Sequence, residues 1–491
     1  MHAQGKVAKY IYIGIITAIY AVCLYMLGRN LTFETLWYDE AGQFFISKGL
    51  NHYSDPYSPE GSVMDVISQN ANYNQDPGGF SIILHFWSVL SDNIVWLRLL
   101  PFIFFIGAIV FTCLAVAEIT HLRLIAYTSG LLLFALWGGH IPYELRPYSM
   151  ELCGMAYGLW MIFRLRQSKH ITITSALAYS LVFAFFLSAR YTIIMFGLVY
   201  ALFALHAIWK NGHAFSVTRQ LSTYIAFCLP LIAVVLYSYI FAMRIQNGHR
   251  QHWWYITYLQ IHHWPFYLYL SGIIISAILL KWQDKSTRLL TYIFLSVTLL
   301  FILLGYFELL PWGFLGNKGA AFVWLWYVTL WCISASMVPK RFWDTQWSNY
   351  VYAFAAIILI TLSNRQFLTL ELWGKTQGSV NSMLKAIPAD SIRPIIINAF
   401  ASPSIRYAYE YASVPAESPS YPESFILLSG PDHTGTGVSY EEYERQESSI
   451  KHNAPTGTLY INVPPSLVNW RMLILIKNDN NEFEPLLIPN N

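Results

Sequence analysis

Long apolar stretches constrain this chain more than any other feature of its sequence. A helix that crosses a bilayer needs about 20 mostly apolar residues, and about eleven segments meet or approach that length. Charged residues make up only 12% of the 491 residues, whereas soluble proteins average roughly 25%. So few charges could not solvate a protein that is 55% hydrophobic. The sequence therefore predicts an all-α polytopic membrane protein, with spans near residues 10–28, 99–118, 124–143, 147–163, 172–189, 191–209, 222–243, 266–281, 289–307, 320–338 and 348–363.

Lysine and arginine are distributed unevenly between the two sides of these spans. With the N-terminus in the cytoplasm, the inner loops hold about thirteen basic residues, against roughly eight on the longer outer loops. This bias predicts a multi-pass protein of the plasma (inner) membrane with a cytoplasmic N-terminus and an extracytoplasmic C-terminal region. The net charge of only +3 and the lack of a basic run argue against nucleic acid as a partner.

Two large outer regions define the predicted domains. Residues 1–363 form the membrane domain, with a large first outer loop at 29–98, and residues 364–491 form a small extracytoplasmic α/β domain. Two helical segments are expected in the first loop, an amphipathic helix that stops at a glycine and an apolar segment too short to span the membrane. They lie at 39–49 and 80–90. In the second region short apolar runs, typical of strands, alternate with helix-like stretches. The runs lie at 394–399, 425–429, 458–463 and 472–476, and the stretches at 402–412 and 439–450.

Asp39 and Glu40 lie just beyond the outer end of the first span, within the run Trp37-Tyr38-Asp39-Glu40-Ala41. Their structural interpretation is that Asp39 caps the short helix while Glu40 favours its first turn. Their functional interpretation is a carboxylate at the membrane surface that deprotonates a hydroxyl or holds a metal ion. The residues alone leave both interpretations open.

Asp76 closes the same loop, immediately before Pro77, Gly78 and Gly79. Proline and glycine favour a tight turn, so Asp76 is either a turn former or a second acid returned to the membrane face. Other acids near span ends are expected to be solvated, namely Glu118, Glu151 and Glu308. The membrane centre is almost free of charge, which argues against an ion-coupled transporter.

Arg146 stands at the outer start of the fourth span, directly before Pro147. Free amides at a helix N-terminus favour anions, so an arginine there predicts a phosphate site to which Glu144 and Tyr148 also belong. The alternative is an arginine that only anchors the helix at the membrane interface. Arg250 and Lys318 are weaker phosphate candidates on other outer segments.

Four motifs, taken in order and with their sidedness, resemble one family. They are Trp37-Tyr38-Asp39-Glu40-Ala41, Asp76-Pro77, Leu97-Arg98-Leu99-Leu100-Pro101 and Glu144-Leu145-Arg146-Pro147-Tyr148. Over roughly the first 210 residues the chain resembles the integral-membrane glycosyltransferases of GT-C type that use polyprenyl-phosphate sugars, a group that includes protein O-mannosyltransferases and aminoarabinose transferases. The glycines after Pro77 depart from the pattern, since many relatives have His or Asp followed by two prolines.

The resemblance implies a catalytic acid at Asp39 with Glu40 beside it, and Asp76 as a further catalytic candidate. The expected activity moves a sugar from a polyprenyl-phosphate donor to an extracytoplasmic glycolipid, glycan or protein, with inversion at the anomeric carbon. The departing phosphate needs positive charge, from Arg146 or from a divalent ion, although no cofactor is firmly indicated. Alternative functions are a lipid-linked glycan flippase and a glycan polymerase or ligase.

Overall fold

The computed structural model describes most of the membrane helices and parts of the C-terminal region. The described residues are 2–32, 36–51, 57–74, 76–136, 141–168, 170–211, 216–248, 264–306, 320–338, 346–363, 395–397, 402–412, 425–427, 440–462 and 473–485.

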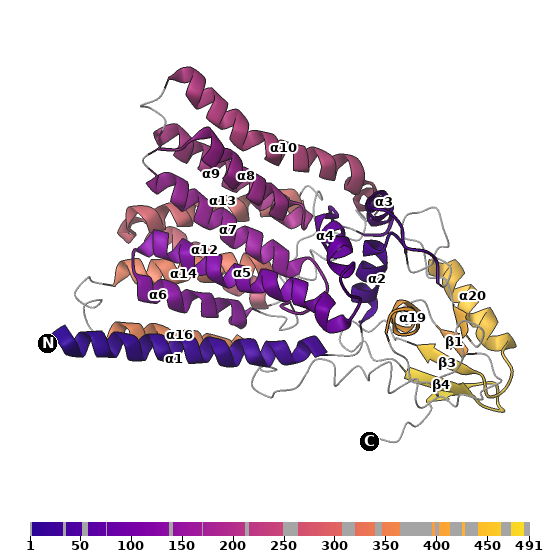
Figure 1. The fold of residues 1–491 in the computed structure, drawn as a ribbon. Helices are drawn as coiled ribbons and strands as arrows, with labels where there is room; N and C mark the ends of the chain where they lie inside the picture. The colour runs from indigo at the N-terminus through magenta and orange to yellow at the C-terminus, as the bar shows by residue number, and fades with distance from the viewer. Residues whose placement is uncertain are drawn as a thin grey trace.

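A bundle of long helices makes up most of the fold (Figure 1). Among the described residues, six helices are long and apolar enough to cross a membrane. They are α1 (His2–Gly28), α5 (Ile94–Thr120), α9 (Tyr191–Asn211), α10 (Val217–Gly248), α13 (Lys285–Tyr306) and α14 (Ala320–Met337).

Each of the remaining predicted spans also coincides with helical structure. These segments are α6 (Arg123–Ser129) with η2 (Gly130–Ala135), α7 (Tyr148–Gln167), α8 (Ile173–Leu187), α12 (Trp264–Ile278) with η3 (Leu279–Trp282), and α16 (Gln346–Ser363). The prediction of an all-α membrane domain is therefore confirmed. The count of eleven crossings stays a prediction, because several of these segments are short for a bilayer.

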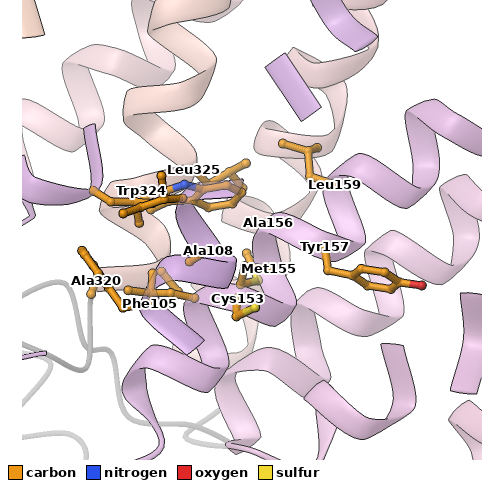
Figure 2. Packing of buried hydrophobic residues seen from close by; sticks show 14 of the residues in the cluster. Phe105, Ala108, Cys153, Met155, Ala156, Tyr157, Leu159, Ala320, Trp324 and Leu325 are labelled. Atoms are coloured by element: carbon orange, nitrogen blue, oxygen red, sulfur yellow. The ribbon is translucent and has the colours of Figure 1, made fainter. Parts of the chain in front are cut away.

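The core of the bundle lies where α5, α7 and α14 meet (Figure 2). Phe105 and Ala108 of α5 pack near Met155 and Ala156 of α7, and Trp324 of α14 is completely buried. The Trp324 indole nitrogen donates to the Thr112 hydroxyl at 3.0 Å, so the one polar atom of this side chain is satisfied. Small residues let the helices approach closely, as expected for packing within a membrane.

Three short helices cover one end of the bundle: α2 (Tyr38–Ser47), α3 (Val63–Tyr73) and α4 (Gly79–Ser88) (Figure 1). The two segments predicted here, 39–49 and 80–90, correspond to α2 and α4. The expected glycine stop is also present, since Gly49 follows α2 with a positive φ of 71°. Helix α3, which follows the N-cap Ser62, was not expected from the apolar pattern of the sequence.

Gly79 allows α4 to approach the end of α8 very closely. Its amide donates to the Ser188 carbonyl oxygen at 3.0 Å. A Cβ atom at Gly79 would lie 1.9 Å from the Ser188 hydroxyl oxygen and 2.8 Å from the backbone oxygen of that residue. Gly79 therefore fits a contact between α4 and the end of α8 that a larger residue would not allow.

We expect Gly79→Ala to lower the free energy of unfolding by about 1–3 kcal/mol, because the added methyl group overpacks this contact. Gly42→Ala in α2 is the matched control, since no heavy atom lies within 4 Å of the added Cβ. The control should be neutral or slightly stabilising. Unfolding of the two purified variants in detergent compares them, and equal stability would refute this role of Gly79.

The C-terminal region contains a mixed sheet with the order β2-β1-β3-β4-β5 among the described residues. Strand β1 pairs in parallel with both β2 and β3. Strand β4 pairs antiparallel with β3, and β5 pairs antiparallel with β4. The elements are β1 (Ile395–Ile397), α19 (Ser402–Glu410), β2 (Phe425–Leu427), α20 (Tyr440–Asn453), β3 (Leu459–Asn462), β4 (Leu473–Lys477) and β5 (Phe483–Pro485). The predicted small α/β domain is confirmed in its elements, while its boundary at residue 364 stays a prediction.

Helix α19 docks this α/β unit onto α2. The Arg406 side chain is fully buried and lies 4.5 Å from the centre of the Phe45 ring. The Tyr407 ring meets the Phe44 ring edge-on at 5.1 Å, and its hydroxyl donates to the Asp92 carbonyl oxygen at 2.8 Å. The first large loop and the C-terminal region therefore lie at the same end of the bundle, as the sequence predicts, with α2 of the first loop packed against α19.

Candidate active site

Charged residues gather where α2 and the turn before α4 meet the N-terminal ends of α5, α7 and α9. The segments that carry them are far apart in the sequence but are joined here by hydrogen bonds and ion pairs. The members of this cluster are Asp39, Glu40, Asp76, Arg98, Glu144, Arg146, Glu151 and Arg190.

Glu40 is a buried junction between three segments. Its two oxygens accept bonds from the Arg98 guanidinium, at 3.1 Å from Nε and 2.7 Å from the terminal nitrogen. They also accept from the Leu145 amide at 2.8 Å and from the Trp37 amide at 3.3 Å. Because Asp39 precedes Glu40 and Arg146 follows Leu145, this carboxylate fixes the spacing between the candidate base and the candidate phosphate ligand.

Breaking the Glu40–Arg98 pair should destabilise the fold strongly. In Glu40→Gln the Arg98 guanidinium stays buried without its counter-charge, and such a loss costs about 3–5 kcal/mol. The control is Arg164→Gln, which breaks a pair between Glu118 and an Arg164 side chain that is 52% exposed. That pair is worth at most about 1 kcal/mol. Thermal unfolding in detergent gives the comparison, and a Glu40→Gln protein as stable as the control would contradict this structural role.

Arg190, between α8 and α9, holds a second group of acids. One of its terminal nitrogens lies 2.7 Å from a Glu151 oxygen, and its Nε lies 3.3 Å from an Asp76 oxygen. The guanidinium also stacks 4.7 Å from the centre of the Tyr148 ring, and the Thr192 hydroxyl donates to Glu151. Arg190 thereby ties the turn before α4 to the first turn of α7.

Buried amides hold the turn that carries Asp76. The Asn70 side chain donates to the Asp76 carbonyl oxygen at 2.8 Å and accepts from the Asn74 side chain at 3.0 Å and from the Ser81 hydroxyl at 2.7 Å. The Gln43 side chain of α2 joins this network by donating to Ser81 at 2.7 Å. The turn is thus fixed by side chains as well as by Gly78, whose φ is 96°.

Asp39 and Arg146 differ from the other charged members of the cluster. Both side chains are partly exposed, and within the described residues neither has a hydrogen bond or an ion pair. The Nε atom of Arg146 is nevertheless buried, so it is a donor in need of a partner. Burial would lower the pKa of the Arg146 guanidinium, but Asp39 and the other nearby anionic groups raise it above its ordinary value. The site therefore keeps one permanent cation and one carboxylate available for ligands.

Glu144 is buried at the same place, with 2% of its side chain exposed. Burial, followed by repulsion from Glu40, raises the pKa of Glu144 well above its ordinary value. The charged form of Glu144 is therefore less favourable here than that of an exposed glutamate.

The structure brings six of the eight predicted site residues into one cluster. These are Asp39, Glu40, Glu144, Arg146, Tyr148 and Asp76. The other two, Arg250 and Lys318, lie outside the described residues.

One of the two interpretations left open for Asp39, and the expectation for Glu151, are wrong. Asp39 does not cap α2, because Trp37 occupies the N-cap position and Glu40 bonds the Trp37 amide. Glu151 is not solvated, since 2% of it is exposed and it pairs with Arg190. Sequence reasoning also missed Arg190, although a lone arginine between two apolar segments on the outer side was a signal for it.

A metal site was the other expected source of positive charge. Within the part of the chain that the structure describes, no three residues among His, Cys, Asp and Glu are grouped to hold a metal ion. Glu40 does not suit a metal, because both of its oxygens already accept bonds from N–H groups. The Asp39 carboxylate accepts no hydrogen bond among the described residues, so its oxygens remain available to a ligand.

The comparisons with known proteins concern the fold. No protein-family model and no curated protein sequence matches this chain. The crystal structure of ArnT from Cupriavidus metallidurans bound to undecaprenyl phosphate matches with a TM-score of 0.50 at 13% identity, over 94% of this chain and 97% of that chain. The apo structure of the same protein gives a TM-score of 0.48 at 13% identity, over 96% and 98% of the two chains.

The match to the undecaprenyl-phosphate-bound structure shows the fold of this chain. It is the GT-C type fold of ArnT, an aminoarabinose transferase, from the membrane bundle through the C-terminal region. The fold that the four sequence motifs implied is thereby confirmed.

Proposed function

We propose that this chain is an integral-membrane glycosyltransferase that takes a sugar from a polyprenyl-phosphate donor. The observation that carries the proposal is that Asp39 and Arg146 have no side-chain hydrogen bond or ion pair among the described residues, whereas the neighbouring Glu40, Arg98, Asp76, Glu151 and Arg190 are paired with one another. The bound undecaprenyl phosphate of the structurally similar ArnT supports a lipid phosphate as the leaving group.

Arg146 binds the donor phosphate in this proposal. It directly precedes Pro147 and α7, where free backbone amides and the helix dipole also favour an anion. A guanidinium offers planar, paired donors to phosphate oxygens, and its buried Nε atom has no other partner among the described residues. Arg250 and Lys318 remain further phosphate candidates.

Asp39 is the base in this proposal. It takes the proton of the acceptor hydroxyl, whose oxygen then forms a bond to the anomeric carbon while the bond from that carbon to the phosphate oxygen breaks. The electron pair leaves with the lipid phosphate, and Arg146 stabilises the negative charge that develops there. A single displacement of this kind inverts the anomeric configuration.

The other acids of the cluster hold neighbouring segments in place and do not act on the substrate in this proposal. Glu40 fixes the segments that carry Asp39 and Arg146, and Asp76 is engaged by Arg190 beside Tyr148. We therefore assign Glu40 and Asp76 as positioning residues and keep Asp39 as the catalytic carboxylate. The buried Glu144 and the Tyr148 hydroxyl complete the walls of the phosphate site.

The site faces the extracytoplasmic side in this proposal, as does the α/β unit at the same end of the bundle (Figure 1). A membrane-impermeant thiol reagent on intact cells should label Ser448→Cys on α20 and spare Ser216→Cys before α10. Both serines are exposed in the structure. The opposite labelling pattern would reverse the orientation and exclude an extracytoplasmic acceptor.

The function itself is tested with purified protein in vesicles and a short-chain polyprenyl-phosphate sugar. The proposal expects release of the free lipid phosphate together with transfer of the sugar to a glycolipid, glycan or protein acceptor. A flippase would move the donor across the vesicle membrane and leave the bond between sugar and phosphate intact. A polymerase or ligase would require a larger lipid-linked glycan as its donor.

A further inference from the structure

A second cationic site lies at the opposite end of the bundle from the candidate active site. A cavity of about 240 Å³ opens there between the C-terminal ends of α7 and α9 and the N-terminal end of α13. Four basic side chains line it: Arg166, Lys210, Lys285 and Arg288.

The distance along the helices places this cavity at the other membrane surface. From Tyr148 at the candidate site to Arg166 is 18 residues of one helix, or about 27 Å at 1.5 Å per residue. The path along α9 from Tyr191 to Lys210 is similar. This length is close to the roughly 30 Å thickness of the hydrocarbon core, so the cavity lies at the level of the headgroups in the opposite leaflet.

The charges of the cavity are not balanced within the part of the protein that the structure describes. None of the four lining cations forms an ion pair there. Arg288 donates to the Gln283 carbonyl oxygen at 3.0 Å, but its buried Nε atom has no partner among the described residues. The nearby Asp284 carboxylate accepts from the Ser286 and Thr287 amides at the start of α13, so it is already engaged.

The rest of the lining is mostly apolar, with Phe203 and Leu289, and it also includes His206 and Tyr292. A ligand that suits both parts has an anionic group for the four cations and, beside it, a less polar portion. Basic pockets between membrane helices bind the anionic headgroups of lipids in this way.

We propose that this cavity binds a phosphate group, either the headgroup of an anionic phospholipid in the leaflet opposite the active site or a small soluble phosphate. This site is separate from the donor phosphate site at Arg146. The proposal for it does not depend on whether the chain transfers sugars.

The test measures ligand binding to the full-length protein by native mass spectrometry from detergent. The probes are phosphatidylglycerol, uncharged phosphatidylcholine and inorganic phosphate. The test variant is Arg166→Gln/Arg288→Gln, which removes the two less exposed cations of the cavity. The control is Arg164→Gln, two residues from Arg166 on the same helix but outside the cavity.

We expect the wild type and Arg164→Gln to bind phosphatidylglycerol in preference to phosphatidylcholine, and the double variant to bind it about tenfold more weakly or worse. Binding of inorganic phosphate that weakens in the same variant supports the site with a soluble ligand as its source. Equal binding by the double variant and the wild type would overturn the proposal. An equal loss in Arg164→Gln would also overturn it, because that result indicates general surface charge.

Discussion

Asp39→Asn is expected to lower the turnover of sugar transfer by about 10²–10⁴-fold, because removal of a positioned general base has an effect of that size. Asparagine has nearly the same volume and keeps one acceptor oxygen, so donor binding should persist. The fold should also persist, since Asp39 neither caps α2 nor forms an ion pair among the described residues. Turnover and donor binding are measured on the same purified protein.

Glu40→Gln is the companion variant for this prediction. It should lose activity together with stability, since Glu40 holds Arg98 and the Leu145 amide. If Asp39→Asn transferred sugar at the wild-type rate while a folded Glu40→Gln protein were inactive, the base would be the neighbouring acid. If both variants were active, the loop would be structural and the proposed chemistry would lose its local support.

Arg146→Ala is expected to weaken donor use by about 10–100-fold, because hydrogen bonds to charged groups contribute about 1.5–3 kcal/mol. Arg146→Lys should fall between the alanine variant and the wild type, since lysine keeps the charge but loses the planar pair of donors. Arg164→Gln near the other end of α7 is the control and should leave donor affinity unchanged. Unchanged donor affinity and turnover in Arg146→Ala would make Arg146 an interfacial anchor only.

Much of the fold could be predicted because membrane helices and short strands leave local signals. The apolar segments, the glycine stop after α2 and the alternation of strands and helices after residue 395 all depend on neighbours in the sequence. Helix α3 also had such a signal, the reciprocal capping pair Ser62 and Asp65. It was missed because the helix is polar and carries no apolar run.

The candidate site was predictable only in part, because its members are joined over long separations. Glu40 accepts from Leu145, which is 105 residues away, and Arg190 pairs with Asp76 across 114 residues. A single sequence shows which side chains are chemically able to act but not which of them are already engaged. The structure makes this distinction, and it separates Asp39 from Glu40 although the two are adjacent.

In the proposed mechanism Asp39 removes the proton of the acceptor hydroxyl, whose oxygen then displaces the lipid phosphate from the sugar. This mechanism is tested most directly by following release of polyprenyl phosphate from a short-chain polyprenyl-phosphate sugar, with and without acceptor, for the wild type and Asp39→Asn. The proposal predicts rapid acceptor-dependent release by the wild type and release lowered at least about 100-fold in a variant that still binds the donor. Equal release by the two proteins, or transfer only from a soluble nucleotide sugar, would contradict it.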